Sequence, residues 1–294
     1  MLNKLAKETL SIAFLLCLLI SPIDSRSQNV GQRIRFASYL TNNEFFEESI
    51  YECEQILSYE ELTESQKDSV FYLKGWALYN LKKLGQSSKS LSEVNPKSPY
   101  YAKSHLFATY NLLHLKKYDQ AQKKLISFQP QNNVQRDFTK FLSAGKDLIR
   151  RDIKQYQNKR NELPSDYYGF SSELKKLDNI AKELLQQNPK SPVLAGIMSG
   201  IIPGSGKIYA GKTGQGVSAF MMTTGLALVT WENYRKRGPE SAGTIIFGSA
   251  FSLFYIGNIY GAAFSAKIAN DEYNQVTDRQ ILFNLHVPLR NVFD

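Results

Sequence analysis

The sequence predicts an all-α chain, in which a helical-repeat solenoid is followed by a C-terminal transmembrane helical hairpin. Two observations favour this fold class. Residues Leu81–Leu91 and Leu115–Leu125 align at an offset of 34 positions and share a Lys-Lys pair and their terminal leucines. Further along the chain, the stretches 213–231 and 241–266 contain no charged residue. The first pattern is typical of stacked helical units, and the second of helices that cross a bilayer.

The first 27 residues have the layout of a secretory signal peptide. A basic start with Lys4 and Lys7 precedes an apolar run over 12–20, and the small residues Ser25 and Ser27 follow it. We expect cleavage after Ser27, which would send the rest of the chain across a membrane. An uncleaved anchor helix is the alternative, although the apolar run is short for a span.

The next segment, 28–190, is expected to be helical and built from repeats. Pro96 and Pro130 keep the 34-residue register, and the small residues Ser87 and Ala121 occupy equivalent positions where two helices can approach closely. The block 115–125 resembles the central turn and second helix of the tetratricopeptide repeat family, whose 34-residue unit is a pair of antiparallel helices. A generic all-α bundle is the alternative, because three units are the minimum for a stacked core.

Other positions extend this repeat in both directions. An earlier unit is visible around Ala37, and Gly75 and Thr109 occupy equivalent positions in the first helices of the next two units. Two or three further helices are expected over 134–162 and 166–187.

The uncharged stretches predict a membrane hairpin. At about 1.5 Å per residue, the 19 residues of 213–231 reach about 29 Å, close to a hydrocarbon core of about 30 Å. The 26 residues of 241–266 can span it with tilt. The loop between them carries Arg235–Arg237 beside Trp231 and Tyr234, as is typical of a membrane interface. Buried helices of a soluble core are the alternative, since Ser, Thr and Asn dilute the hydrophobicity.

A glycine-rich turn precedes the hairpin. The pattern Pro-Gly-x-Gly-x-x-Tyr-x-Gly at 203–211, with Tyr-x-Gly-Asn-x-Tyr-Gly at 255–261, resembles a bacterial family of small membrane domains. The resemblance implies a membrane turn formed by Pro203, Gly204, Gly206, Tyr209 and Gly211. Glycines four residues apart let helices approach closely in lipid, and the residues expected to serve helix packing are Gly196, Gly200, Gly257, Asn258 and Gly261.

The same segment also matches the phosphate-binding loop of nucleotide-hydrolysing enzymes. Gly206, Gly211, Lys212 and Thr213 satisfy G-x-x-x-x-G-K-[ST] letter for letter. That loop needs a buried strand before it, whereas glycines and Pro203 interrupt the preceding apolar run. No later apolar run ends at an Asp that could bind Mg²⁺. We therefore expect a chain that is not an enzyme, with a P-loop nucleotide-binding enzyme as the alternative.

Charge and composition restrict other functions. Residues 41–66 contain eight Glu and no Lys or Arg, whereas 82–160 hold 17 Lys and Arg against five Asp and Glu, a net charge of +12. In an exported chain this favours an acidic partner or anionic lipid over nucleic acid. The three histidines lack metal-ligand spacing, and Cys53 is the single cysteine once the signal is removed. We expect no metal, no cofactor and no intramolecular disulfide.

These patterns divide the chain into a signal peptide at 1–27, a tetratricopeptide-like domain at 28–190, a glycine-rich membrane helical domain at 191–270 and a tail at 271–294. The tail could pack on the array or lie at the membrane. The expected function is a membrane-anchored, exported scaffold or adaptor of the bacterial cell envelope. Its repeat domain would lie in the periplasm and bind an envelope protein through its concave surface.

Overall fold

The computed structural model describes residues 26–58, 61–164 and 169–293. Within these ranges the chain forms 13 helices and no strand, which confirms the all-α prediction. Apart from its last two residues, the expected signal peptide lies outside the described part of the chain. The chain divides into two compact units, one formed by the described residues up to Ser143 together with Phe293, and the other by Ala144–Val292.

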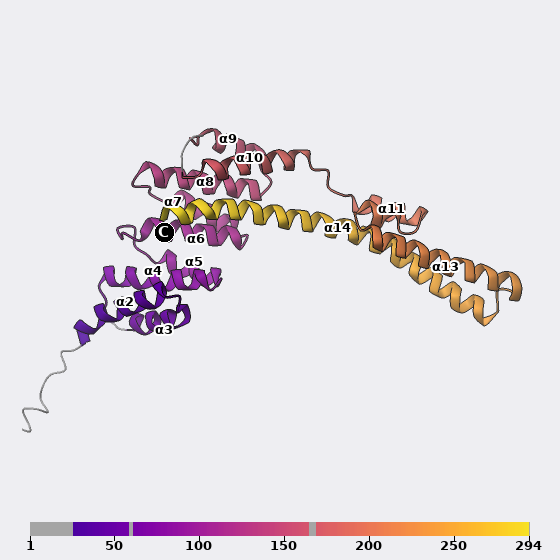
Figure 1. Ribbon diagram of the computed structural model, residues 1–294, viewed down its shortest axis with the longest axis horizontal. Coiled ribbons are helices and arrows are strands. Elements are labelled where there is room, and N and C mark those ends of the chain that lie inside the picture. The colour runs from indigo at the N-terminus through magenta and orange to yellow at the C-terminus, as the bar shows by residue number, and fades with distance from the viewer. Residues whose placement is uncertain (1–25, 59–60, 165–168, 294) are drawn as a thin grey trace, which may run out of the picture. The chain divides into compact units, whose positions relative to one another are not determined.

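The first unit consists of consecutive helices, and those before residue 128 pack against their neighbours in the chain (Figure 1). They are α2 (Arg26–Asn42), α3 (Phe46–Leu57), α4 (Glu64–Asn80), α5 (Leu84–Ser92), α6 (Tyr101–His114), α7 (Tyr118–Ser127) and the first part of α8 (Asn133–Ile149). The beginning of α4 shows how local sequence sets these bounds. The Thr63 hydroxyl accepts the N–H of Gln66, and the Gln66 side chain accepts the N–H of Thr63, so two N–H groups that lack helical partners are satisfied.

One type of turn recurs within the helix pairs. At the turn between α4 and α5, Lys82 has a φ of 61°, its N–H donates to the Tyr79 carbonyl at 3.0 Å, and the N–H of Lys83 donates to the Leu78 carbonyl at 2.9 Å. This pair of bonds closes a helix end when the turn residue is left-handed. The same bonds and a positive φ recur at three other turns, centred on Glu44, Lys116 and Arg151.

Small residues meet where the helices of a pair cross. The Ser87 hydroxyl donates to the Gly75 carbonyl at 2.7 Å, and the Ser49 hydroxyl donates to the Ala37 carbonyl at 3.2 Å. A Cβ added to Gly75 would lie 2.6 Å from the Leu91 side chain, so the crossing has no room for a larger residue. Gly75 and Ser87 therefore lie where the 34-residue spacing predicted close packing.

The second unit contains the end of α8 and six further helices. They are α9 (Ile153–Asn161), α10 (Ser171–Gln186), α11 (Pro192–Ile201), α12 (Ser205–Tyr209), α13 (Thr213–Arg237) and α14 (Ala242–Phe293). Helix α10 packs on α9, where the Tyr156 hydroxyl donates to Asp178 at 2.7 Å and the Arg160 guanidinium donates to the same carboxylate at 2.9 Å. Ser191 caps α11, and Pro192 stands at its first turn.

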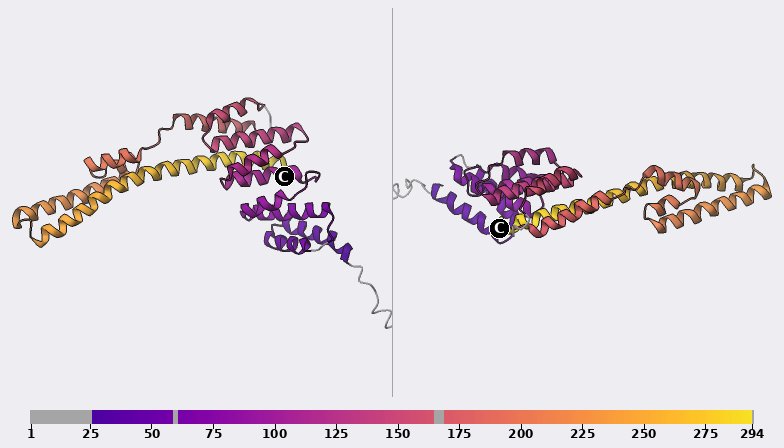
Figure 2. Two further views of the ribbon diagram at one scale, coloured as in Figure 1. Left: turned by 180° about the vertical axis from the view of Figure 1, so that it is seen from behind. Right: turned by 90° about the horizontal axis from the view of Figure 1, so that it is seen from above.

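Helices α13 and α14 run side by side in opposite directions, as all the views in Figures 1 and 2 show. An added Cβ on Gly248 would lie 3.4 Å from Thr230, and one on Gly243 would lie 2.5 Å from Asn233. Among the described helices, α14 is long and apolar enough to cross a membrane, and α11 is a shorter apolar helix. The hairpin is thus present, and one of its two helices has the length and composition of a span.

Residues 271–293 do not form a separate tail. They continue α14 without interruption, and Leu285 on this part lies against Gly145 near the end of α8. An added Cβ on Gly145 would lie 2.5 Å from Leu285, and Arg151 pairs with Asp278 at 2.8 Å. The charged residues after Ala266 end the apolar stretch, yet they lie on the same continuous helix.

Candidate functional site

The glycine-rich turn joins α11 to α12 through Pro203 and Gly204. Gly204 has a φ of +84°, a conformation that residues with a side chain rarely adopt. A Cβ at this position would also overlap the carbonyl oxygen of Gly216 on α13. Both the turn and the contact with α13 therefore require glycine at this position.

Gly206 brings α12 against α11. An added Cβ would overlap the Ala195 carbonyl oxygen and lie 2.6 Å from its carbonyl carbon. The N–H of Gly206 donates to the Ser199 hydroxyl at 3.0 Å, in a buried position. Glycine at 206 thus permits a close backbone contact that Ser199 holds in place.

Tyr209 and Gly211 complete the turn. The Tyr209 hydroxyl accepts the N–H of Ser191 at 3.1 Å, and the Lys190 ammonium lies 4.9 Å from the centre of the Tyr209 ring. Gly211 has a φ of +84° and ends α12, since the N–H of Lys212 donates to the Lys207 carbonyl at 2.9 Å. Each tyrosine and glycine of the motif at 203–211 therefore has a structural position in the turn.

The second motif lies on α14 and faces α11. The Tyr255 hydroxyl donates to the Gly200 carbonyl, and the Asn258 amide donates to the Ser199 carbonyl at 3.4 Å. Asn258 is only 4% exposed, and its Oδ1 has no hydrogen-bond partner among the described residues.

The glycines expected to serve helix packing differ in how close the neighbouring helix lies. Added Cβ atoms on Gly196 and Gly200 would make ordinary contacts with Ile259 at 3.7 Å, and one on Gly261 would lie 3.4 Å from the Lys207 side chain. The close approach expected at Gly257 is absent, because a Cβ there would meet open space.

The residues that match the P-loop motif are arranged differently from a phosphate-binding loop. Gly206 lies within helix α12, with its N–H directed at Ser199 instead of at a ligand. The Lys212 ammonium pairs with Glu272 on α14 at 2.9 Å, and Thr213 begins α13. The element before the turn is the helix α11, where a phosphate-binding loop has a strand.

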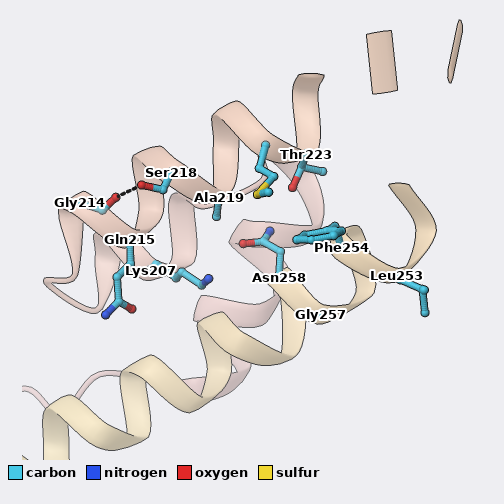
Figure 3. A pocket seen from close by; sticks show the side chains of 11 residues that line it. Lys207, Gly214, Gln215, Ser218, Ala219, Thr223, Leu253, Phe254, Gly257 and Asn258 are labelled. Atoms are coloured by element: carbon cyan, nitrogen blue, oxygen red, sulfur yellow. Dashed lines mark hydrogen bonds between the residues drawn. The ribbon is translucent and has the colours of Figure 1, made fainter. Parts of the chain in front are cut away.

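A groove of about 730 Å³ opens beside this turn, between α12, α13 and α14 (Figure 3). Its polar lining includes Lys207, Gln215, Ser218, Thr223 and Asn258, and its apolar lining includes Met222, Leu253 and Phe254. The lining contains no carboxylate, imidazole or thiol. The groove thus combines a few polar groups with apolar side chains, which is typical of a binding site.

Large apolar side chains are exposed on α11, α13 and α14. Patches of this kind on a protein surface indicate contact with lipid or with another protein. The exposed residues include Val193, Ile197, Ile201, Phe220, Met221, Leu228, Ile245, Ile246, Leu253, Ile256 and Phe264.

A second, basic cleft of about 490 Å³ lies in the first unit and is lined by residues of α5, the end of α6 and α7. Lys117, Lys123 and Lys124 line it together with Lys89 and Glu93. Burial lowers the pKa of Lys124, and the nearby Glu93 carboxylate partly opposes that shift. Such a cleft can attract an acidic group.

Among the described residues there is no group of three or more His, Cys, Asp and Glu that could hold a metal ion. His105 stands alone and is used structurally, because its Nε2–H donates to the Lys124 carbonyl at 2.7 Å. Burial lowers the pKa of His105 to about 4.

The sequence alone does not identify several residues of the site. No sequence pattern marks Ser199, Gln215 or the pairing of Lys212 with Glu272, since each depends on a contact between helices. Lys207 occupies an unspecified position of the pattern Pro-Gly-x-Gly-x-x-Tyr-x-Gly. Comparisons with protein-family models, with curated proteins and with solved structures find no match for this chain.

Proposed function

We propose that this chain is a membrane-anchored helical-repeat scaffold of the bacterial cell envelope, without catalytic activity. In this proposal the region 191–270 anchors it in a bilayer and the helical array at 28–190 binds an envelope protein. The observation that carries the proposal is the apolar surface exposed on α11, α13 and α14, which water would solvate poorly.

The charges along α13 and α14 support membrane anchoring. The stretches 213–231 and 242–266 lack charge, and Trp231 and Tyr234 stack with ring centres 6.0 Å apart beside Arg235–Arg237. Aromatic rings and clustered basic residues are enriched where a helix leaves the hydrocarbon. The hairpin would thus have one interface near residue 237 and the other near Lys267.

Helices α11 and α12 suggest a re-entrant pair beside this hairpin. The ten residues of α11 reach about 15 Å, roughly half of a hydrocarbon core. After the turn at Gly204, α12 returns toward the side from which α11 came. Irregular backbone is tolerated at such depth where protein buries it, and the contact of Gly204 with Gly216 does so.

The orientation can be tested by cysteine labelling in cells. Cysteines placed at Glu240, in the basic loop, and at Glu48, in the array, would be probed with an impermeant maleimide, with Cys17 replaced by Ser. Cys53 needs no replacement, because it is fully buried and burial raises its pKa to about 12. The basic loop should face the cytoplasm, so the reagent should modify only the array. Modification of both sites from outside would reject this orientation.

The recurring turn and the small residues at the helix crossings support a tetratricopeptide-like array. The turns centred on Lys82 and Lys116 are 34 residues apart, and that at Arg151 follows 35 residues later. A single tetratricopeptide-like helix pair cannot bury its apolar face alone, so stacking of neighbours would provide a continuous core.

The basic cleft between α5 and α7 is the proposed partner site on the array. Lys117 and Lys123 would attract an acidic segment of an envelope protein, since net positive charge extends over 82–160. A photo-crosslinking residue at Gln120, which lines the cleft, should capture a partner in cells. Reversing both lysines to Glu should abolish the adduct, and a crosslinker at the exposed Glu48 is the control. Equal capture from both positions, or capture unchanged by charge reversal, would contradict this role.

A further inference from the structure

The groove beside the glycine-rich turn contains an unpaired cation. Within the described ranges no carboxylate or hydrogen-bond acceptor pairs with Lys207, whereas Lys212 pairs with Glu272 and Lys236 with Glu232. Figure 3 shows the Lys207 side chain and the Asn258 amide extending into the same space. A cation in this position is suited to an anionic ligand.

Asn258 supplies a second, independent sign of a ligand site. Its side chain is almost completely buried and lines the groove, yet its Oδ1 has no partner among the described residues. A buried amide oxygen without a partner is costly. The Lys207 ammonium has three donors, so it can serve this oxygen and still donate to an anion.

Other donors lie at the same end of the groove. Gln215 and Gly214 line it, and both belong to the first turn of α13, where backbone N–H groups have no helical acceptor. The N-terminus of a 25-residue helix also carries partial positive charge. Together with Lys207 these groups favour a phosphate over a neutral group.

Polar groups predominate at one end of the groove and apolar side chains at the other (Figure 3). Lys207 lies beside Gly261, five residues or about 8 Å from the end of the uncharged stretch at Ala266. Phe254 lies seven residues or about 10 Å further from that end, with Leu253 and Met222 also in the lining. In a bilayer this order matches a headgroup near the interface and an acyl chain below it.

We propose that this groove binds one anionic phospholipid from the surrounding bilayer. Its phosphate contacts Lys207 and Gln215, Asn258 positions the ammonium, and one acyl chain lies along Met222, Leu253 and Phe254. A net negative headgroup fits because the lining has a cation and no carboxylate to receive choline or ethanolamine. The inference rests on the proposed membrane anchoring.

The test uses the full chain, purified in neutral detergent, and measures thermal unfolding by circular dichroism. Short-chain phosphatidylglycerol should raise the melting temperature in a saturable manner, and phosphatidylcholine or inorganic phosphate should not. Lys207→Met should weaken the apparent affinity by at least about tenfold, as expected for a lost charge-assisted contact, and Lys207→Arg should restore it. Lys236→Met removes a cation far from the groove and is the matched control.

A second variant tests the apolar part of the groove. An added Cβ at Gly257 meets open space, so Gly257→Leu should fold and should obstruct the acyl chain. It should abolish the effect of phosphatidylglycerol while leaving the melting temperature without lipid close to wild type.

Extraction of cell membranes with alkaline carbonate separates the two proposals. If the wild-type chain resists extraction, three results would overturn the lipid site alone. These are an equal rise in melting temperature with phosphatidylglycerol and phosphatidylcholine, a rise with inorganic phosphate, or a rise with phosphatidylglycerol that persists in Lys207→Met. Release of the wild-type chain by carbonate would overturn the membrane anchoring and, with it, the lipid site.

Discussion

The carbonyl oxygen of Ala195 occupies the space that a side chain on Gly206 would need. This contact joins α11 to α12, and the hydrogen bond from the Gly206 N–H to the Ser199 hydroxyl fixes its geometry. Because the obstacle is backbone and not a flexible side chain, the two helices would have to separate to admit even a methyl group.

Gly206→Ala should therefore destabilise the turn severely. Overpacking typically costs about 1–3 kcal/mol, and the rigid backbone obstacle places this site at the upper end, so we expect little protein in membrane fractions and a lower melting temperature in detergent. Gly225→Ala is the matched control, because Gly225 lies in α13 with nothing within 4 Å of an added Cβ. Wild-type accumulation of Gly206→Ala would show that this packing does not exist in the membrane.

The array offers a second test at Ser87. Its hydroxyl donates to the Gly75 carbonyl at 2.7 Å and accepts the Asn111 amide at 2.9 Å, both in buried positions. Ser87→Ala leaves the Asn111 amide without a partner, which should lower the free energy of unfolding by about 1–3 kcal/mol. Ser92→Ala, on the exposed face of the same helix, should change it by less than about 0.5 kcal/mol. Denaturant unfolding gives the free energy of unfolding of both variants. Equal losses in Ser87→Ala and Ser92→Ala would contradict the hydrogen bonds of Ser87 with Gly75 and Asn111.

His105 should make the stability of the array depend on pH. Burial lowers its pKa in the folded chain to about 4 from the ordinary histidine value of 6.5, so the unfolded chain binds the proton more readily. The contribution of His105 to the free energy of unfolding is fully present above about pH 6.5. It is lost as the pH falls toward 4, and the loss amounts to about 3 kcal/mol.

We would measure unfolding of the wild type and of His105→Gln by circular dichroism between pH 7 and 4. The difference between the two isolates the contribution of His105 from the titration of carboxylates. The variant should lose most of the decline between pH 6.5 and 5. His114→Gln is the control, since His114 is an exposed residue at the end of the same helix and should retain the decline. An identical pH profile in His105→Gln would refute the assignment.

The sequence could predict the helical class and the small positions of the array because both are local patterns. Ser87 and Gly75 lie 12 residues apart, and the 34-residue spacing marks their counterparts. The helix pair α8–α9 was harder to recognise, because Tyr156 stands where the other pairs have a small residue. Ala144, which is also fully buried, stands at the position equivalent to Gly75. In this pair a large residue stands on one helix and a small residue on the other, so the repeat cannot be recognised from small residues at both positions.

The extent of α14 and the groove could not be predicted, for a different reason. Charged residues such as Glu272 and Asp278 ended the apolar pattern, but their partners Lys212 and Arg151 are 60 and more residues away in the chain. The groove brings Lys207 to Asn258 across 51 positions of the sequence. Motif spacing identified the turn at Gly204 and Gly206, because its requirements lie within a few residues.

The last prediction separates a scaffold from a nucleotide-binding enzyme. A P-loop depends on its lysine, whose ammonium neutralises the phosphates. Here the Lys212 ammonium donates to both oxygens of Glu272, at 2.9 and 3.1 Å. The two side chains are 30% and 59% exposed, so the pair should contribute no more than about 1 kcal/mol. Lys212→Met and Glu272→Gln each break this pair and should lower the melting temperature alike and slightly.

Neither variant nor the wild type should respond to ATP or GTP with Mg²⁺. A nucleotide present at about 100 times its dissociation constant would stabilise the folded chain by about 2.7 kcal/mol, which a melting experiment resolves. Glu272→Gln is the informative control, because it removes the ion pair and leaves Lys212 available to a phosphate. A Mg²⁺-dependent rise that persists in Glu272→Gln and disappears in Lys212→Met would establish nucleotide binding through Lys212 and overturn the scaffold proposal.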